Sequence, residues 1–345
     1  MRWDNLRLEV QQRDDRVTVP LFDQGAVVRT FDTPEFRGMT FYEVRAKSII
    51  NRVPEASYVP FRWTINPYRG CSSACVYCFA RKTHTYLDLD YGEDFNSKIV
   101  VKVNAPQLLR KELAAKKWQG EHIAMGTNVD PYQRAEGRYK LMRGILEGLR
   151  DAGNPFSILT KWTMITRDID LLRQCAEVAE IGTNMSVGCV DEDYWHAIEP
   201  GTPSPMRRLD AVRKLNEAGI PCGVLMAPII PFISDDDGSL ERTVKAIAES
   251  GATHVSPIVL HLRKGGSREW WMKWLGENRP ELVPKYRELY GDRAYLPKEF
   301  QKQVADRVHA FAHRYAVGQK TGAQARRLRE TAAPQTPEPQ QLSLA

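Results

Sequence analysis

Three of the six cysteines in this 345-residue chain lie within eight residues, at Cys71, Cys75 and Cys78, with the spacing C-x3-C-x2-C. Thiolate sulfurs so close in sequence can converge on one centre, and such soft ligands select iron–sulfur clusters or zinc. Three ligands are one fewer than a four-iron cluster or a tetrahedral zinc ion requires. An open coordination position is what a catalytic metal site keeps, so the loop predicts a metal centre with room for another molecule.

The surrounding segment reads Asn-Pro-Tyr-Arg-Gly-Cys at 66–71 and Cys-Phe-Ala-Arg at 78–81, with Tyr77 before the third cysteine. It resembles the radical S-adenosylmethionine (SAM) superfamily, and the wider wording is similar to the branch related to spore photoproduct lyase, labelled "DNA repair photolyase". The resemblance implies that the three cysteines hold three irons of a [4Fe-4S] cluster. Tyr77 fills the aromatic position of the motif, and SAM occupies the fourth iron.

The resemblance also implies a reaction. A radical SAM enzyme cleaves SAM reductively to a 5′-deoxyadenosyl radical, which abstracts hydrogen from a substrate. We therefore expect a lyase-like or transferase-like enzyme that takes electrons from a flavodoxin or ferredoxin and acts on an unidentified substrate. The protein residues are expected to ligate the cluster, orient SAM and substrate, and exclude water, because the cofactors carry out the radical chemistry.

Two departures separate the chain from a true spore photoproduct lyase. Such a lyase uses a cysteine just after its second strand as hydrogen donor, where this chain has Met125, Gly126 and Thr127. It also relies on a tyrosine directly after the third cluster cysteine, where this chain has Phe79. Neither glycine nor phenylalanine can relay a hydrogen atom, so we expect a relative with a different substrate.

Two other function classes stay open from the residues alone. His84 could complete a Cys3His zinc site in a nucleic-acid-binding protein, although the spacing is unusual for a zinc finger. An electron carrier would need a cluster but no SAM site. Disulfides are not expected, because the chain shows no secretory context.

Composition bounds the protein class without naming a substrate. Apolar residues make up 42% of the chain and charged residues 27%, as in ordinary globular proteins. The net charge of +6 permits nucleic acid as a partner but does not require it. Residues 1–15 contain no apolar signal region, and the apolar run at 224–233 is broken by Pro228 and Pro231. We therefore expect a cytoplasmic protein with no membrane association.

Short apolar runs alternate with helical patterns from Phe61 onward, which is typical of repeated β/α units. The pattern predicts an α/β fold, a partial (β/α)6 TIM-like barrel of the kind that the resemblance implies. An accessory strand is expected at 98–103. The six barrel strands are expected at 63–66, 122–125, 156–160, 183–187, 223–229 and 254–260.

The barrel is expected to span 60–262. Before it, 1–59 form an N-terminal extension with short strands, for example at 17–21. After it, 263–318 form a C-terminal helical cap, and 319–345 form a polar, disordered tail. Trp270, Trp271 and Trp274 in the cap could stack on bases, but their helical spacing favours a place in the core.

Functional groups of α/β barrels gather at the carboxyl ends of the strands. The resemblance implies that Gly126 and Thr127 bring backbone to the amino group of SAM, and that Lys161 pairs with its carboxylate. It further implies that Glu199 and Arg207, favoured over Arg208, lie near the same ligand. The other candidates at strand ends are Asn128 and Asp130 toward SAM or substrate, Ser186 toward the ribose, and Pro228 in the loop that meets adenine. Cys175, Cys189 and Cys222 are isolated, so no second cluster is expected.

Overall fold

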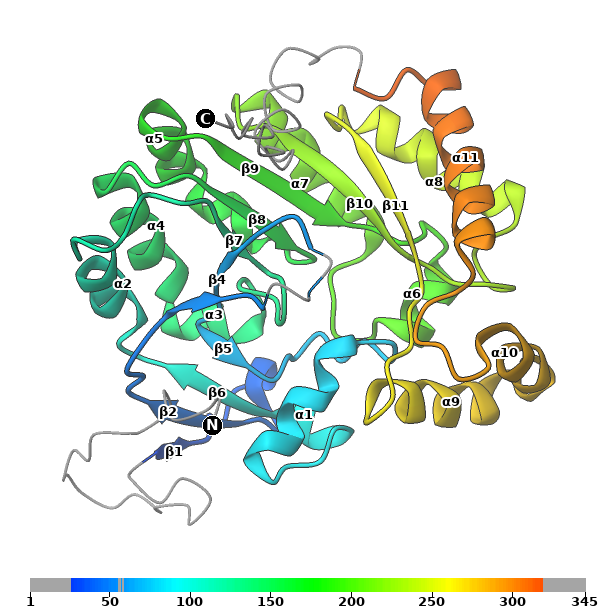
Figure 1. Cartoon of the computed structure of the whole chain (residues 1–345), viewed down its shortest axis with the longest axis horizontal. Coiled ribbons are helices and arrows are strands. Elements are labelled where there is room, and N and C mark those ends of the chain that lie inside the picture. The colour runs from blue at the N-terminus through cyan, green and yellow to red at the C-terminus, as the bar shows by residue number, and fades with distance from the viewer. Residues whose placement is uncertain (1–25, 55–56, 58, 319–345) are drawn as a thin grey trace, which may run out of the picture.

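The computed structural model describes residues 26–54, 57 and 59–318, and its centre is a seven-stranded sheet (Figure 1). The strand order is β11-β10-β9-β8-β7-β4-β3, in which six strands run parallel and β3 is antiparallel to β4. The strands are β3 (Ile50–Arg52), β4 (Trp63–Ile65), β7 (Ile123–Met125), β8 (Phe156–Thr160), β9 (Ile181–Ser186), β10 (Cys222–Ile229) and β11 (Val255–Val259).

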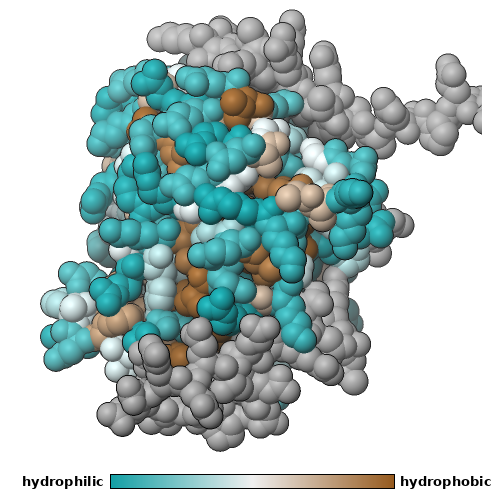
Figure 2. Space-filling view, turned by 90° about the vertical axis from the view of Figure 1, so that its left-hand side faces the viewer, coloured by the Kyte–Doolittle hydropathy of each residue, from teal (hydrophilic) through white to brown (hydrophobic). Residues whose placement is uncertain are grey.

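The six predicted barrel strands are confirmed, and the chain adds them in sequence order, as repeated β/α units require. The connecting helices are α2 (Ala105–Leu113), α4 (Leu141–Asp151), α5 (Ile169–Val178), α7 (Pro205–Glu217) and α8 (Asp237–Glu249). Figure 2 shows the face that carries α2, α4 and α5, where hydrophilic residues cover most of the described surface and hydrophobic ones fill the seams.

Local sequence explains where the helices after β9 and β10 begin. The Ser204 hydroxyl accepts a hydrogen bond from the Arg207 amide, and Pro205 occupies the first helical position of α7. The Asp236 carboxylate caps α8 in the same way by accepting from the Ser239 amide at 2.9 Å. These caps fix the direction in which each helix leaves the strand ends that face the cavity described below.

A second sheet leads into the cysteine loop. Its order is β1-β2-β6-β5, from β1 (Val27–Arg29), β2 (Thr40–Val44), β6 (Lys98–Lys102) and β5 (Tyr68–Arg69). The accessory strand expected at 98–103 is thus present as β6, and β2 of the N-terminal extension pairs with it. The sequence did not predict β5, which ends two residues before Cys71. The strand expected at 17–21 and the tail at 319–345 lie outside the described residues.

The remaining elements are short helices in the loops and a helical C-terminal region. That region packs in two places: α11 lies against α8 and β11, and α9 lies against η4. Trp271 is fully buried and stacks on Trp274 with ring centroids 5.1 Å apart, as the helical spacing predicted. These elements are η3 (Pro34–Phe36), η4 (Phe79–Leu87), α1 (Glu93–Ser97), α3 (Arg134–Tyr139), η5 (Thr163–Asp168), α6 (Glu192–Ile198), α9 (Ser267–Asn278), η6 (Pro280–Leu282), α10 (Val283–Tyr290) and α11 (Lys298–Arg314).

Within the described ranges, no helix combines the length and apolarity needed to cross a membrane.

Candidate functional site

A cavity of about 200 Å³ lies where the carboxyl ends of the parallel strands meet the cysteine loop. All three clustered cysteines line it, so the loop and the strand ends form one site. Seven other residues predicted from the sequence also line this cavity: Tyr77, Gly126, Asn128, Asp130, Lys161, Ser186 and Pro228. Thr127, Glu199 and Arg207 do not.

The barrel loops hold the cysteine loop in place. The fully buried Gln133 side chain accepts from the Ser72 amide at 3.0 Å and donates to the Gly70 carbonyl at 2.8 Å. The Trp162 indole donates to the Ser73 hydroxyl at 2.9 Å. Gly70 has φ +79°, and a Cβ there would lie 2.8 Å from the Lys98 carbonyl, so a side chain is excluded at the start of the loop.

The cysteines fit the donor set of an iron–sulfur cluster. All three are free and border one cavity. Among the described residues, no three His, Cys, Asp or Glu side chains are arranged to hold a single metal ion. A four-iron cluster instead offers each cysteine a separate iron, so its ligands surround a space rather than meet at a point. Burial raises the pKa of the Cys71 thiol to about 11, and iron would supply the positive charge that favours the thiolate.

His84 does not join the cysteines. Its Nε2 lies 2.9 Å from the Lys98 carbonyl, and its ring packs edge-on against Phe95 at 5.3 Å. The ring is buried outside the cavity, where burial lowers its pKa. The residue that could complete a Cys3His zinc site is therefore directed at the backbone of β6.

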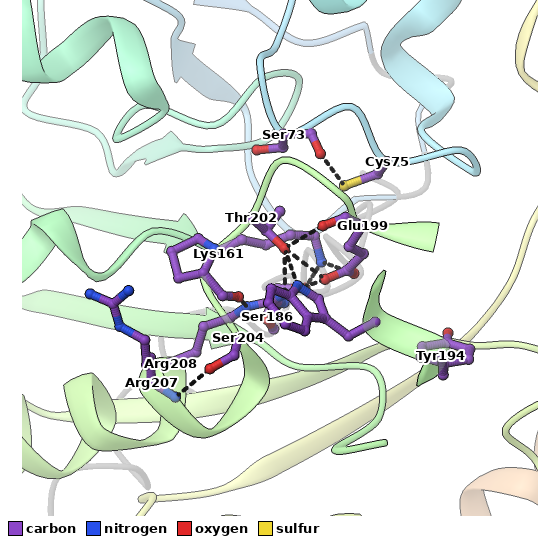
Figure 3. Close-up of polar contacts among 12 residues, drawn as sticks. Ser73, Cys75, Lys161, Ser186, Tyr194, Glu199, Thr202, Ser204, Arg207 and Arg208 are labelled. Atoms are coloured by element: carbon purple, nitrogen blue, oxygen red, sulfur yellow. Dashed lines mark hydrogen bonds and ion pairs between the residues drawn. The ribbon is translucent and has the colours of Figure 1, made fainter. Parts of the chain in front are cut away.

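A charged network links residues that line the cavity to Glu199 and Arg208, which do not line it (Figure 3). The Lys161 ammonium donates to the Ser186 hydroxyl at 2.6 Å and pairs with Glu199 Oε1 at 3.1 Å. The Tyr77 hydroxyl donates to the same Glu199 oxygen, and Arg208 Nη2 pairs with Glu199 Oε2. The Glu199 carboxylate thus ties the cysteine loop to the ends of β8 and β9.

The electrostatics of this network favour an ionised Glu199. Burial alone would raise the pKa of the carboxyl group. The charges of Arg208 and Lys161, together with the hydrogen bond from Tyr77, outweigh burial and lower the pKa to about 2. Both cations are consequently held by a carboxylate that keeps its charge at any pH above the acid range.

The structure brings Arg208, and not the favoured Arg207, into this network. Arg208 is buried and also donates to the Ser186 carbonyl at 3.0 Å and to the Thr202 hydroxyl at 2.7 Å. Arg207 is exposed, and its backbone amide contacts the Ser204 cap (Figure 3). The structure thus places Arg208, and not the favoured Arg207, beside Glu199.

Asp130 orients the loop that carries Lys161. Its carboxylate accepts from the Thr160 hydroxyl at 2.6 Å, from the Lys161 amide at 2.6 Å and from the Tyr132 amide at 2.9 Å. Burial raises the pKa of this carboxyl group, and these hydrogen bonds oppose the effect. Asp130 thus lines the cavity while its oxygens are engaged with the ends of β7 and β8.

Gly126 brings two strands into close contact. Its φ is +81°, and a Cβ at this position would lie 1.8 Å from the Leu159 carbonyl oxygen. Only glycine tolerates both conditions. A cysteine side chain therefore does not fit at Gly126, in the region where spore photoproduct lyases carry their hydrogen donor.

Among the titratable residues that line the cavity, His261 is the one that was not predicted from the sequence. His261 lines the cavity, with its ring centroid 5.6 Å from that of Phe79 and stacked at 5.2 Å on that of Tyr295. Burial and the nearby Arg263 charge lower the pKa of His261 to about 4, so the imidazole is neutral at pH 7. It directly follows the sixth predicted strand, so the strand-end rule that selected Lys161 and Ser186 could have found it.

The radical SAM superfamily model matches residues 65–247 of the chain. The chain belongs to the radical SAM superfamily. An uncharacterized protein of Mycobacterium tuberculosis is 43% identical over 316 residues, covering 91% of this chain and 93% of the relative. An uncharacterized protein of Methanocaldococcus jannaschii is 35% identical over 195 residues, covering 56% of this chain and 69% of the relative.

This radical SAM protein is also similar in fold to solved structures. Spore photoproduct lyase complexed with dinucleoside spore photoproduct matches with a TM-score of 0.60 and 16% identity, covering 81% of this chain and 80% of that one. A mutant of the same lyase with bound AdoMet and dinucleoside spore photoproduct matches with a TM-score of 0.58 and 16% identity, over 76% and 77%. At this identity the likeness concerns the fold.

Proposed function

We propose that this radical SAM protein is an enzyme that binds a [4Fe-4S] cluster through Cys71, Cys75 and Cys78 and reductively cleaves SAM. The observation that carries the proposal is that the three cysteines share one cavity with polar groups from successive strand ends. When bound, the cluster and SAM supply a 5′-deoxyadenosyl radical, which takes hydrogen from a substrate.

The residues of the chain bind and orient SAM in this proposal. Lys161 is the cation for the SAM carboxylate, and Glu199 and Arg208 hold its ammonium group in position. The backbone of Gly126 and Thr127 approaches the SAM amino group. Ser186 faces the ribose, and the loop at Pro228 meets the adenine.

The substrate enters beside Phe79 and His261. Phe79 is 38% exposed and both rings line the cavity, so they are the groups that an incoming molecule would meet. Gly126 leaves no room for a thiol, which is why we do not propose repair of spore photoproduct. A flavodoxin or ferredoxin is proposed as the electron donor.

The test is anaerobic reconstitution with iron and sulfide, followed by dithionite, SAM and an assay for 5′-deoxyadenosine. We expect product from the wild type and none from Cys75→Ala. Cys175→Ala is the matched control, because Cys175 is a buried cysteine on α5 outside the cavity, and it should keep the activity. A colourless, zinc-loaded wild type that gives no product after reconstitution would overturn the proposal and favour a zinc-stabilised nucleic-acid-binding protein.

A further inference from the structure

Arg81 is a fully buried cation whose guanidinium contacts the backbone of the cysteine loop. Its guanidinium donates to the Cys75 carbonyl at 2.9 Å from Nη2 and at 3.3 Å from Nε. Nη1 donates to the Gly92 carbonyl at 2.9 Å and to the Tyr91 carbonyl at 3.0 Å. Nη2 also donates to Asn96 Oδ1 at 3.0 Å.

Two aromatic rings pack against this guanidinium. Its central carbon lies 4.8 Å from the ring centroid of Trp270 and 5.2 Å from that of Phe95. Trp270 belongs to α9, and a Cβ on Gly92 would lie 2.4 Å from its ring, so the cover is tightly packed. Water therefore has little access to the Arg81 charge.

The charge of Arg81 has no carboxylate in contact with it among the described residues. Its hydrogen-bond acceptors are neutral backbone carbonyls and one amide oxygen. The Asn96 side chain, which accepts from Arg81, in turn donates to the carboxylate of the exposed Glu93 at 3.4 Å. Glu93 therefore reaches Arg81 only through Asn96. Buried charges in proteins are normally paired, because burial of an isolated ion is costly. An anionic partner is therefore missing from the protein's own residues.

The cysteine loop supplies that partner once it binds a cluster. Arg81 lies against Cys75, one of the three cysteines, and its charge acts on all three sulfurs. A four-iron cluster with three thiolates is anionic, and reduction by one electron adds a further negative charge. A fixed positive charge nearby stabilises the reduced form more than the oxidised form, because reduction potentials follow net charge and hydrogen bonding around the cluster.

We propose that Arg81 is the buried counter-charge of the cluster and raises its reduction potential into the range that an electron donor can reach. The inference rests on the proposed function, since it needs a cluster at Cys71, Cys75 and Cys78. Arg81 is a positioning residue for the loop as well, so its test must read the potential and not activity alone.

Asn96→Asp is the sharpest variant, because it is isosteric and places a carboxylate against the guanidinium while leaving Arg81 and its backbone contacts in place. Arg81→Gln removes the charge, and Arg81→Lys keeps it with fewer hydrogen bonds. Asn278→Asp is the control for net charge: this residue lies at the exposed end of α9 and bonds the Trp274 carbonyl.

The full-length protein is reconstituted anaerobically and titrated with dithionite at poised potentials, with the reduced cluster followed by electron paramagnetic resonance. In Asn96→Asp and Arg81→Gln we expect the ratio of reduced to oxidised cluster at a fixed potential to fall at least tenfold, equivalent to 59 mV for a one-electron couple. Arg81→Lys and Asn278→Asp should stay within threefold of the wild type.

The two proposals fail differently. A wild type that assembles no cluster overturns the proposed function. A wild type and variants that all load a cluster, with the potential of Asn96→Asp unchanged, overturn the inference about Arg81 alone and leave it a purely structural residue. If Arg81→Gln does not fold, Asn96→Asp and Arg81→Lys still decide the question.

Discussion

Replacement of Glu199 by glutamine should destabilise the cluster-free protein strongly. The carboxylate is buried and accepts from Tyr77, Lys161 and Arg208. A neutral amide removes the negative charge between two cations and turns an N–H group toward one of its donors. Breaking a buried pair by removing one partner is costly because the other charge stays buried.

The size of the effect follows from the lowered pKa. A fall in the pKa of Glu199 from its ordinary value of 4.5 to about 2 in the folded state corresponds to about 3 kcal/mol of stability at neutral pH. The folded-state pKa is depressed, so this stability is present above pH 4.5 and is lost as the pH falls toward 2. The difference in the free energy of unfolding between the wild type and Glu199→Gln should decrease by about 1.4 kcal/mol per pH unit in that window.

Urea unfolding of the full-length protein under reducing conditions, followed by tryptophan fluorescence at pH 7, 5 and 3.5, measures this difference. Glu147→Gln is the control, because Glu147 pairs with Arg110 at 3.2 Å on the surface with side chains 38% and 45% exposed. It should change stability by less than about 0.5 kcal/mol. A Glu199→Gln effect below about 1 kcal/mol at pH 7, or one that grows between pH 5 and 3.5, would refute the electrostatic reasoning.

Three further outcomes are expected. In the same urea assay, Arg208→Ala should lower the free energy of unfolding by about 3–5 kcal/mol, whereas Arg207→Ala should change it by less than about 0.5 kcal/mol. Equal losses of stability would contradict the inference drawn from the burial of Arg208 and the exposure of Arg207. Gly126→Ala should cost more than about 2 kcal/mol because its Cβ would overlap the Leu159 carbonyl, and a neutral result would show that the backbone relaxes. The imidazole NMR resonance of His261, assigned by its absence in His261→Phe, should not shift between pH 8 and 5.5, because burial and Arg263 lower the pKa of this residue to about 4. A shift with a midpoint near 6.5 would mean that the imidazole is solvated.

The strands and the core of the site could be predicted because both depend on local sequence. Strands buried on both faces read as short apolar runs bounded by turn residues, and β8 was predicted with the bounds that the structure has. In a parallel sheet, side chains just after successive strands must meet at one edge. This is why Lys161 and Ser186, separated by 25 positions, were both selected and now share a hydrogen bond.

The sequence already contained the signal that Arg208, rather than the favoured Arg207, lies beside Glu199. Ser204 and Pro205 fix the start of α7, and the buried stripe then includes Val212 and Leu215. Arg208 lies four positions before Val212 and seven before Leu215, so it shares their face, and Arg207 does not. Helical periodicity, applied to polar residues as well as apolar ones, would have favoured Arg208.

The two-residue strand β5 could not be predicted, because its existence depends on distant partners. Tyr68 and Arg69 pair with Val101 and Val100 of β6, some 30 positions later, and β6 in turn pairs with the N-terminal β2. Two residues carry no periodicity from which a strand could be inferred. For the same reason no chemical role could be predicted for the N-terminal extension, although the sheet that contains its strands β1 and β2 sets where the cysteine loop starts.

The surroundings of the cysteines also explain why the flanking regions belong to the site. The loop lies between β5 and η4, and no strand ladder of its own fixes the positions of its three sulfurs. Gln133 binds the loop from the barrel side, and the pairing of β5 with β6 fixes the position at which the loop begins. Arg81 donates hydrogen bonds to the Cys75 carbonyl and is covered by Trp270 of α9. Because Trp270 belongs to α9, loss of the C-terminal helices would remove one of the rings that cover Arg81 and expose its charge to solvent. The C-terminal helices therefore contribute to the electrostatics of the cysteine site as well as to the core.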